Sequence, residues 1–190
     1  MVDELRQVDL DGRQIRVLAH PLRARLLGEL RLEGPATATR LAAVLGTNTG
    51  ATSYHLRQLA EVGLVAEEPG AGRGRERWWR SAHDTSSWRA GSFAGDRDAQ
   101  AAADWMLHYG VTRMVDSFEQ WRRAEADEPR EWREAVDLSD YMLTLTPEQV
   151  RELTDELHTV IERHRRTAEP GPDSRRVHFY VYAVPRKETS

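Results

Sequence analysis

The sequence predicts a mainly helical α+β protein, and three features of the chain lead to this prediction. Residues 21–62 contain three short helical periodicities, and two strand-like segments around a glycine-rich turn follow them. Residues 99–125 are helical in character and have a broad apolar face. The rest of the chain reads as a small β-α-β unit. We therefore expect two domains, residues 1–90 and residues 91–190.

Leucines recur at helical spacing over residues 21–32, and Pro21 suits the first turn of a helix. A second helix is expected over residues 37–45. Thr37 can cap its first turn, and Gly46 can end it in a left-handed conformation. The two helices are therefore expected to be short and close in sequence.

A third helix is predicted over residues 48–62, with Asn48 as its N-terminal cap. Thr52, Leu56 and Leu59 fall on one face of this helix, at spacings of four and three residues. That face is expected to be buried, so the opposite face is expected to be exposed to solvent.

Residues 65–68 and 76–81 are predicted to form the two strands of a β-hairpin, or wing, around a turn of glycines and arginines. Trp78 and Trp79 point to opposite faces of the second strand, so one is expected inside and the other partly exposed. Three helices followed by a hairpin specify a winged helix-turn-helix domain.

The segments AHPLRARLLGEL, ATRLAAVLG and ATSYHLRQLAEVGLV, followed by the Gly/Arg wing, resemble the ArsR-type winged-helix repressors. The resemblance covers roughly residues 10–82. It implies a homodimeric DNA-binding regulator, usually a repressor, with the helix near residues 48–62 in the major groove of double-stranded DNA. It does not cover the C-terminal β-α-β unit.

A helix that reads DNA hides one face and shows polar side chains of moderate length on the other. The candidate DNA contacts of the third helix are Asn48, Thr49, Gly50, Ser53, Tyr54 and Arg57. Those of the wing are Arg73, Arg75 and Arg77, which are expected to follow phosphates or to enter the minor groove. His55 lies beside a buried leucine, and a structural role is favoured for it over base reading.

The chain has 190 residues and a net charge of −4, but the charge is unevenly distributed. Residues 1–90 carry 13 arginines against 11 acidic residues, whereas residues 91–190 are acidic overall. The chain has no cysteine, which excludes disulfides and thiolate metal sites. No apolar run is long enough to span a membrane and no secretory signal is apparent, so a cytoplasmic protein is expected.

In the C-terminal half, strands are expected at residues 141–145 and 176–184, on either side of a helix. The segment TPEQ, residues 146–149, is a strong helix start, and an apolar stripe continues to about Arg166. The strand at 176–184 is expected to bury the face that carries Val177 and Phe179.

The aromatic residues of this half have two interpretations. They form the core of a dimer joined through residues 99–125, which is favoured, or they line a pocket for a small apolar or aromatic effector. The candidate effector contacts are Trp105, His108, Tyr109 and Trp121. Asp104 and His108 lie four residues apart on the helix, but two ligands are too few for a zinc site. No metal or cofactor is therefore expected.

Three functional classes are open to such a chain. A dimeric DNA-binding regulator is favoured, with an operator that is an inverted repeat of half-sites about 34 Å apart. A winged helix that binds proteins without binding DNA is the alternative, but Ser53, Arg57 and the wing arginines argue against it. An enzyme is not expected, because the chain has no phosphate-binding glycine loop and no recognisable nucleophile motif.

Overall fold

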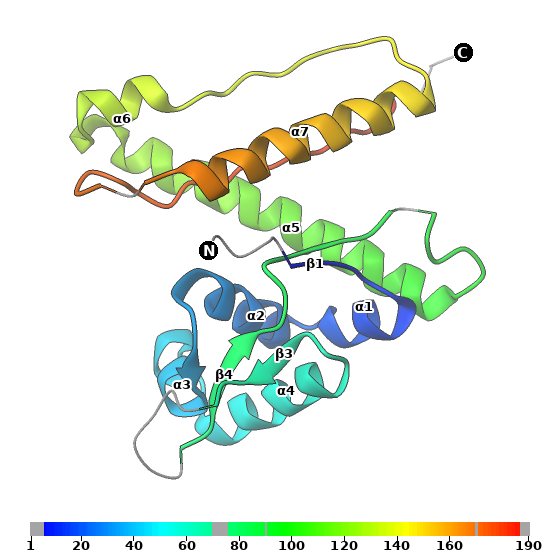
Figure 1. Ribbon diagram of the computed structural model, residues 1–190, viewed down its shortest axis with the longest axis vertical. Coiled ribbons are helices and arrows are strands. Elements are labelled where there is room, and N and C mark those ends of the chain that lie inside the picture. Colours follow the sequence, from blue (N-terminus) through cyan, green and yellow to red (C-terminus); the bar gives the residue numbers. More distant parts are fainter. Residues whose placement is uncertain (1–5, 70–75, 90, 170, 187–190) are drawn as a thin grey trace. The chain divides into compact units, whose positions relative to one another are not determined.

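The computed structural model describes residues 6–69, 76–89, 91–169 and 171–186 and is mainly helical, as predicted (Figure 1). The chain divides into two compact units, Asp3–Arg113 and Met114–Ser190, here called the N-terminal and C-terminal units. The long helix α5, Arg97–Ala124, contributes to both. Within the described part of the chain, no helix has the length and apolarity needed to cross a membrane.

In the C-terminal unit, the described residues form the last part of α5 and three further helical segments: η1 (Glu125–Asp127), α6 (Arg130–Ala135) and α7 (Pro147–Thr167). The predicted start of α7 is confirmed. The Thr146 hydroxyl accepts a hydrogen bond from the backbone N–H of Gln149 at 3.3 Å, and the Gln149 side chain accepts one from the backbone N–H of Thr146 at 2.9 Å. This reciprocal pair satisfies two donors that the first turn of a helix leaves free.

The prediction of a β-α-β unit is wrong for its two strands. Residues 141–145 and 176–184 are extended, but neither belongs to a sheet. A strand needs hydrogen bonds to a neighbouring backbone, and alternation of apolar residues does not provide that neighbour. Phe179, predicted to be buried, is 72% exposed. The opposite face of this segment contacts α5 instead, where the hydroxyl groups of Tyr180 and Ser117 lie 3.1 Å apart.

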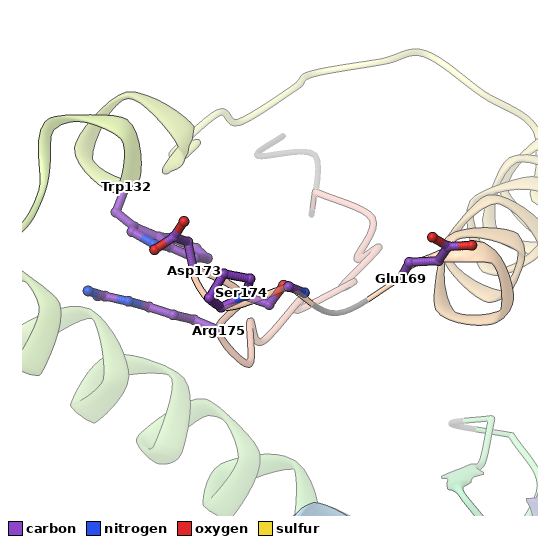
Figure 2. A pocket seen from close by; sticks show the side chains of 7 residues that line it. Trp132, Glu169, Asp173, Ser174 and Arg175 are labelled. Carbon is purple, nitrogen blue, oxygen red and sulfur yellow. The ribbon is translucent and has the colours of Figure 1, made fainter.

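An open hollow within the C-terminal unit lies between α6 and the loop that follows α7 (Figure 2). The guanidinium carbon of Arg175 lies 5.1 Å from the centre of the Trp132 ring, which is a cation–π contact. Arg175 also forms an ion pair with Glu128 at 2.5 Å. These contacts join the loop to α6 and to Glu128 just before it.

The described part of the N-terminal unit contains four helices before α5: α1 (Gly12–Leu18), α2 (Pro21–Glu33), α3 (Ala38–Leu45) and α4 (Thr49–Glu61). Its strands form two small sheets. In the first, β2 (Ala36–Thr37), β4 (Trp78–Ser81) and β3 (Val65–Glu67) are antiparallel in the order β2-β4-β3. In the second, β1 (Gln7–Asp9) and β5 (Thr85–Ser87) are parallel. The predicted order of three helices and a hairpin is confirmed for α2, α3, α4, β3 and β4.

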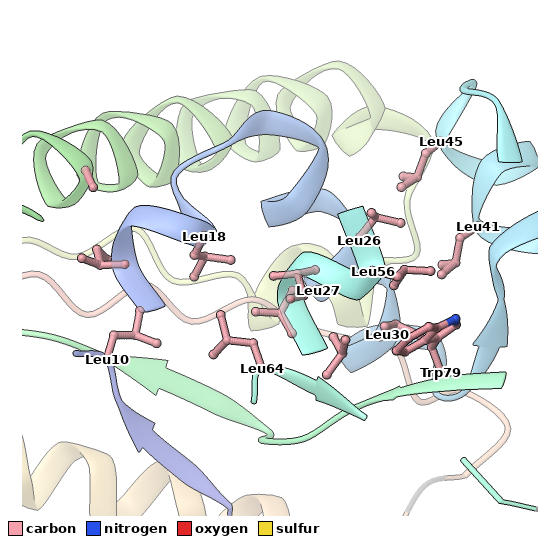
Figure 3. Packing of buried hydrophobic residues seen from close by; sticks show 14 of the residues in the cluster. Leu10, Leu18, Leu26, Leu27, Leu30, Leu41, Leu45, Leu56, Leu64 and Trp79 are labelled. Atoms are coloured by element: carbon pink, nitrogen blue, oxygen red, sulfur yellow. The ribbon is translucent and has the colours of Figure 1, made fainter. Parts of the chain in front are cut away.

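The core of the N-terminal unit is formed mainly by leucines from these helices (Figure 3). Leu26 of α2 and Leu56 of α4 are fully buried, and the side chain of Trp79 in β4 is also part of the core, with 4% of it exposed. Trp78, on the other face of β4, is only partly buried, so the predicted alternation of the two tryptophans is confirmed. Burying a large apolar side chain stabilises the folded state by about 1.5–3 kcal/mol, so this cluster stabilises the packing of the helices against one another.

Helix α1 and the sheet of β1 and β5 were not predicted from the sequence. The first turn of α1 has a capping box, in which Asp11 and Gln14 each accept a hydrogen bond from the other's backbone N–H. This spacing of an acidic cap and a glutamine is a local signal that was available in the sequence. The pairing of β1 with β5 has no such signal, because it joins segments almost eighty residues apart.

Candidate nucleic-acid interface

The helix α4 begins as predicted, with Asn48 as its cap. The side-chain oxygen of Asn48 accepts a hydrogen bond from the backbone N–H of Ala51 at 2.8 Å. The hydroxyl of Thr52 donates to the backbone carbonyl of Asn48 at 3.0 Å. Because the two bonds fix the first turn, the position of the exposed residues that follow is defined relative to the core.

The two faces of α4 differ completely in exposure. Thr52, Leu56 and Leu59 are all at 0% exposure, as predicted. The predicted contact residues lie elsewhere on the helix: Ser53 is partly buried, and the exposed ones are Thr49, Gly50, Tyr54 and Arg57. The structure therefore brings the candidate residues of α4 to one end and one side of the helix. This arrangement suits insertion into a groove of DNA.

Arg77 of the wing contacts two other residues of the same hairpin. Its guanidinium lies 3.1 Å from the carboxylate of Glu67 and 5.8 Å from the centre of the Trp79 ring. Arg80 forms a second ion pair across the hairpin, with Glu68 at 2.8 Å. Arg77 and Glu67 are each more than half exposed, so this pair is weak and open to competition from a phosphate. Arg73 and Arg75 lie outside the described residues.

His55 packs against the start of α2. Its ring lies 4.5 Å from the ring of His20 and 5.2 Å from that of Tyr54, measured between ring centres. Burial lowers the pKa of His55, and the nearby His20 and Arg23 lower it further. Burial also lowers the pKa of His20, with Arg23 as the next cause. The packing supports the predicted structural role of His55. The contact of His20 with His55 was not predicted from the sequence, although His20 lies in AHPLRARLLGEL, one of the segments that carry the resemblance.

Arg31 of α2 is a second residue whose role was not predicted from the sequence. Its side chain donates to the backbone carbonyl of His83 at 3.1 Å and to the hydroxyl of Ser86 at 3.3 Å. Burial lowers its pKa to about 10, while the charge of Asp84 acts in the opposite direction. These bonds tie α2 to β5 and to the segment between β4 and β5. An arginine among leucines on a helix gives no sequence signal for such burial.

The four candidate effector contacts do not meet in a closed pocket. Trp105 and Tyr109 stack on each other, with ring centres 5.1 Å apart and planes 11° apart. The Nδ1 atom of His108 lies 2.7 Å from the carbonyl oxygen of Asp104 in its own helix. Trp121 is partly buried further along α5. Among the described residues, no three histidine, aspartate or glutamate side chains are placed to hold a metal ion.

A comparison with protein families places residues 18–68 in the family described as "Helix-turn-helix domain". These residues include α2, α3, α4 and β3, the elements that carry the buried and exposed faces described above. The chain is a winged helix-turn-helix protein. The resemblance predicted from the sequence is therefore confirmed for this domain, and the C-terminal unit lies outside the match.

Solved structures similar to this winged helix-turn-helix protein are transcriptional regulators. A possible transcriptional regulator for arsenical resistance is 30% identical; the match covers 62% of this chain and 97% of that one, with a TM-score of 0.32. A mutant of MarR from E. coli, complexed with operator DNA, is 18% identical over 79% of this chain and 84% of its own, with a TM-score of 0.31. ZitR from Lactococcus lactis is 14% identical over 76% and 83%, with a TM-score of 0.35. No curated protein matches the chain.

Proposed function

We propose that the chain is a DNA-binding transcriptional regulator that acts as a repressor, and that it binds an inverted-repeat operator as a homodimer. The observation that carries this proposal is the division of α4 into a fully buried face and an exposed polar face. A surface helix that does not contact DNA needs only side chains that are solvated on its outer face. Here that face also begins with a capped first turn and Gly50, which lets a backbone approach closely.

The partly buried Ser53 and the exposed Tyr54 and Arg57 of α4 have the chemistry for base reading. The hydroxyl of Ser53 can donate to or accept from a base edge or a phosphate, and the planar fork of Arg57 can pair with the O6 and N7 atoms of guanine. The ring of Tyr54 is 51% exposed and offers an apolar surface to a thymine methyl group. We assign base contacts to these three residues, and backbone contacts to Thr49 and Asn48.

The wing would supply contacts to the DNA backbone. A phosphate can replace Glu67 as the partner of Arg77, because both side chains are exposed and a charged pair in water contributes at most about 1 kcal/mol. We assign Arg73 and Arg75 to the same role from the sequence. These contacts would add affinity without adding sequence preference.

A second copy of the chain is the proposed partner of α5. Leu107, Val111, Val115 and Phe118 recur along this helix at spacings of three or four residues, and each is 39–50% exposed. Exposed apolar residues in such a row mark an interface more often than a free surface. A symmetric pair of helices would cover this row and would set the distance between the two copies of α4.

We propose that a small apolar or aromatic effector releases the repressor from DNA, with the Trp105–Tyr109 stack and the adjacent His108, all in the N-terminal unit, as the starting point of its site. A thermal-shift screen tests this part. A compound that raises the melting temperature of the wild type, but not of a Trp105→Ala variant, supports it. We expect the protein to act in the cytoplasm, where it meets chromosomal DNA.

The proposed DNA binding is tested by fluorescence anisotropy with DNA that flanks the protein's own gene, at two salt concentrations. We expect affinity that falls steeply with salt, and a loss of about 1–3 kcal/mol of binding free energy in Arg57→Ala. Arg163→Ala, an exposed arginine on α7, is the matched control. Binding no tighter than to random DNA would contradict regulation at this site and would favour a helix-turn-helix that binds a protein.

A further inference from the structure

His20 and His55 form a pair that joins α2 to α4. His20 is the cap residue of α2 and lies just before its first turn, whereas His55 lies in the middle of α4. Their ring centres are 4.5 Å apart, and the rings are tilted by 36°. Tyr54 meets His55 edge-on, at 5.2 Å. The pair therefore contacts Tyr54, one of the residues to which we assign base contacts.

The hydrogen bonding of His20 requires a neutral ring. Its Nδ1 atom accepts a hydrogen bond from the backbone N–H of Leu22 at 3.1 Å, which caps α2. A protonated imidazole carries a hydrogen on both nitrogens and accepts no hydrogen bond. Protonation of His20 would therefore replace the cap by two donors facing each other, at a helix end that already carries partial positive charge.

The surroundings of His55 also favour its neutral form. Its Nδ1 atom is buried and has no hydrogen-bond partner in the described part of the chain. In the protonated ring this atom would carry an N–H with no acceptor, which costs more than a buried lone pair.

The charged neighbour that acts on both rings is Arg23 of α2, and its side chain donates to the backbone carbonyl of Val17 at the end of α1. Among the described residues, no carboxylate shifts the pKa of either histidine. Tyr54 is the other titratable group in contact with the pair. A second positive charge at this position would therefore be repelled by Arg23, and for His20 a backbone hydrogen bond acts in the opposite direction as the smallest of the three causes.

We propose that His20 and His55 are a proton-sensitive latch, which holds α4 against the start of α2 only while both rings are neutral. Above pH about 6.5 the pair is neutral and the latch is complete. As the pH falls below that value, protonation removes the cap of α2 and introduces charge repulsion between the two helices. The effect on DNA affinity rests on the proposed function, whereas the effect on the two rings and on stability does not.

The test uses the full chain and a pair of substitutions that remove the titration but keep the shape. In His20→Asn the side chain still caps the helix, because asparagine is among the best cap residues. His55→Gln keeps a polar side chain of similar length. His158→Gln, on the exposed surface of α7, is the control, because it removes a histidine that lies outside the pair and outside the proposed binding sites.

DNA affinity is measured at about pH 8 and about pH 5.5. We expect the wild type and His158→Gln to lose roughly tenfold or more in affinity on acidification, and the double variant to lose much less. An equal loss in all three proteins would overturn the latch. So would an affinity that rises on acidification only in proteins with the pair, because the protonated rings would then be contacting phosphates.

The histidine ring signals in an NMR titration, together with the thermal unfolding midpoint, give a readout without DNA. We expect both rings to titrate below pH about 6.5, and the midpoint to fall on acidification in the wild type more than in His20→Asn alone. Rings that titrate at or above the ordinary value would contradict the latch, even in a protein that binds DNA. If the rings behave as expected but no DNA is bound at either pH, the proposed function fails and the latch stands.

Discussion

The side-chain oxygen of Asn48 lies 2.8 Å from the backbone nitrogen of Ala51, and this one hydrogen bond fixes the start of the helix on which the proposed function depends. Removing it in Asn48→Ala should lower the free energy of unfolding by about 1 kcal/mol, because the first turn of α4 then has a free backbone donor. Urea denaturation measures the change. Asn48→Ser, which keeps a capping oxygen, should be close to the wild type.

A second substitution at Asn48 distinguishes an effect on the stability of α4 from an effect on DNA binding. Asn48→Asp keeps the cap, so we expect unchanged or slightly higher stability. The added negative charge should repel phosphates and weaken DNA binding at low salt. A variant that is less stable but binds DNA as well as the wild type would contradict the placement of Asn48 beside the DNA backbone.

Arg31 should matter for stability and not for DNA contact. Arg31→Ala removes the bonds to His83 and Ser86 and should cost about 2 kcal/mol of unfolding free energy, the range of hydrogen bonds to a charged group. Arg40→Ala, an exposed arginine on α3, should stay within about 0.5 kcal/mol of the wild type. Equal effects in the two variants, measured by urea denaturation, would argue against the role of Arg31.

His83 predicts a pH dependence of stability apart from that of the proposed latch. Burial lowers the pKa of His83, with the charges of Arg31 and Arg6 as further causes and Asp84 opposing them. The folded protein therefore binds a proton less readily than the unfolded chain. Its contribution to stability is present above pH about 6.5 and is lost as the pH falls below that value.

The measurement for His83 is a series of urea denaturation curves between about pH 8 and about pH 5. His83→Gln should reduce the slope of stability against pH in this window, because one group with a shifted pKa is removed. His158→Gln, in the exposed part of α7, is the control and should leave the slope unchanged. A slope equal to that of the wild type in His83→Gln would contradict this assignment.

The row of apolar residues on α5 predicts a dimer that a single charge disrupts. Val111→Glu places a carboxylate in the middle of this row, so sedimentation velocity should show a monomer at concentrations where the wild type is a dimer. Thr112→Glu adds the same charge to an exposed neighbour and should leave the assembly intact. Circular dichroism should show folded protein in both. A wild type that sediments as a monomer would contradict the proposed interface.

The N-terminal unit was largely predictable from sequence because its signals are local. The cap at Asn48, the left-handed Gly46 at a φ of 64°, and the spacing of Thr52, Leu56 and Leu59 each depend on residues within one or two turns. The contacts that were missed depend on distant segments. His20 meets His55, and Arg31 meets His83, only after the chain has folded.

The C-terminal unit shows the opposite case. The helix start at Thr146 is local and was predicted, whereas the strands at 141–145 and 176–184 required a neighbouring backbone that the sequence pattern does not specify. Alternation at Val177, Phe179 and Val181 indicates an extended segment. It does not indicate which face is covered, and the covered face turned out to be that of Tyr180.

The most direct test of DNA reading by α4 is a selection of DNA fragments from a random-sequence pool by the full-length protein, because the operator need not be identified beforehand. We predict an enriched inverted repeat with half-site centres about 34 Å apart, and we expect Arg57→Ala to lose the preference for one base pair in each half while keeping the rest. Arg163→Ala should enrich the same repeat as the wild type. No enriched sequence, or an identical one with Arg57→Ala, would contradict the claim that α4 reads DNA.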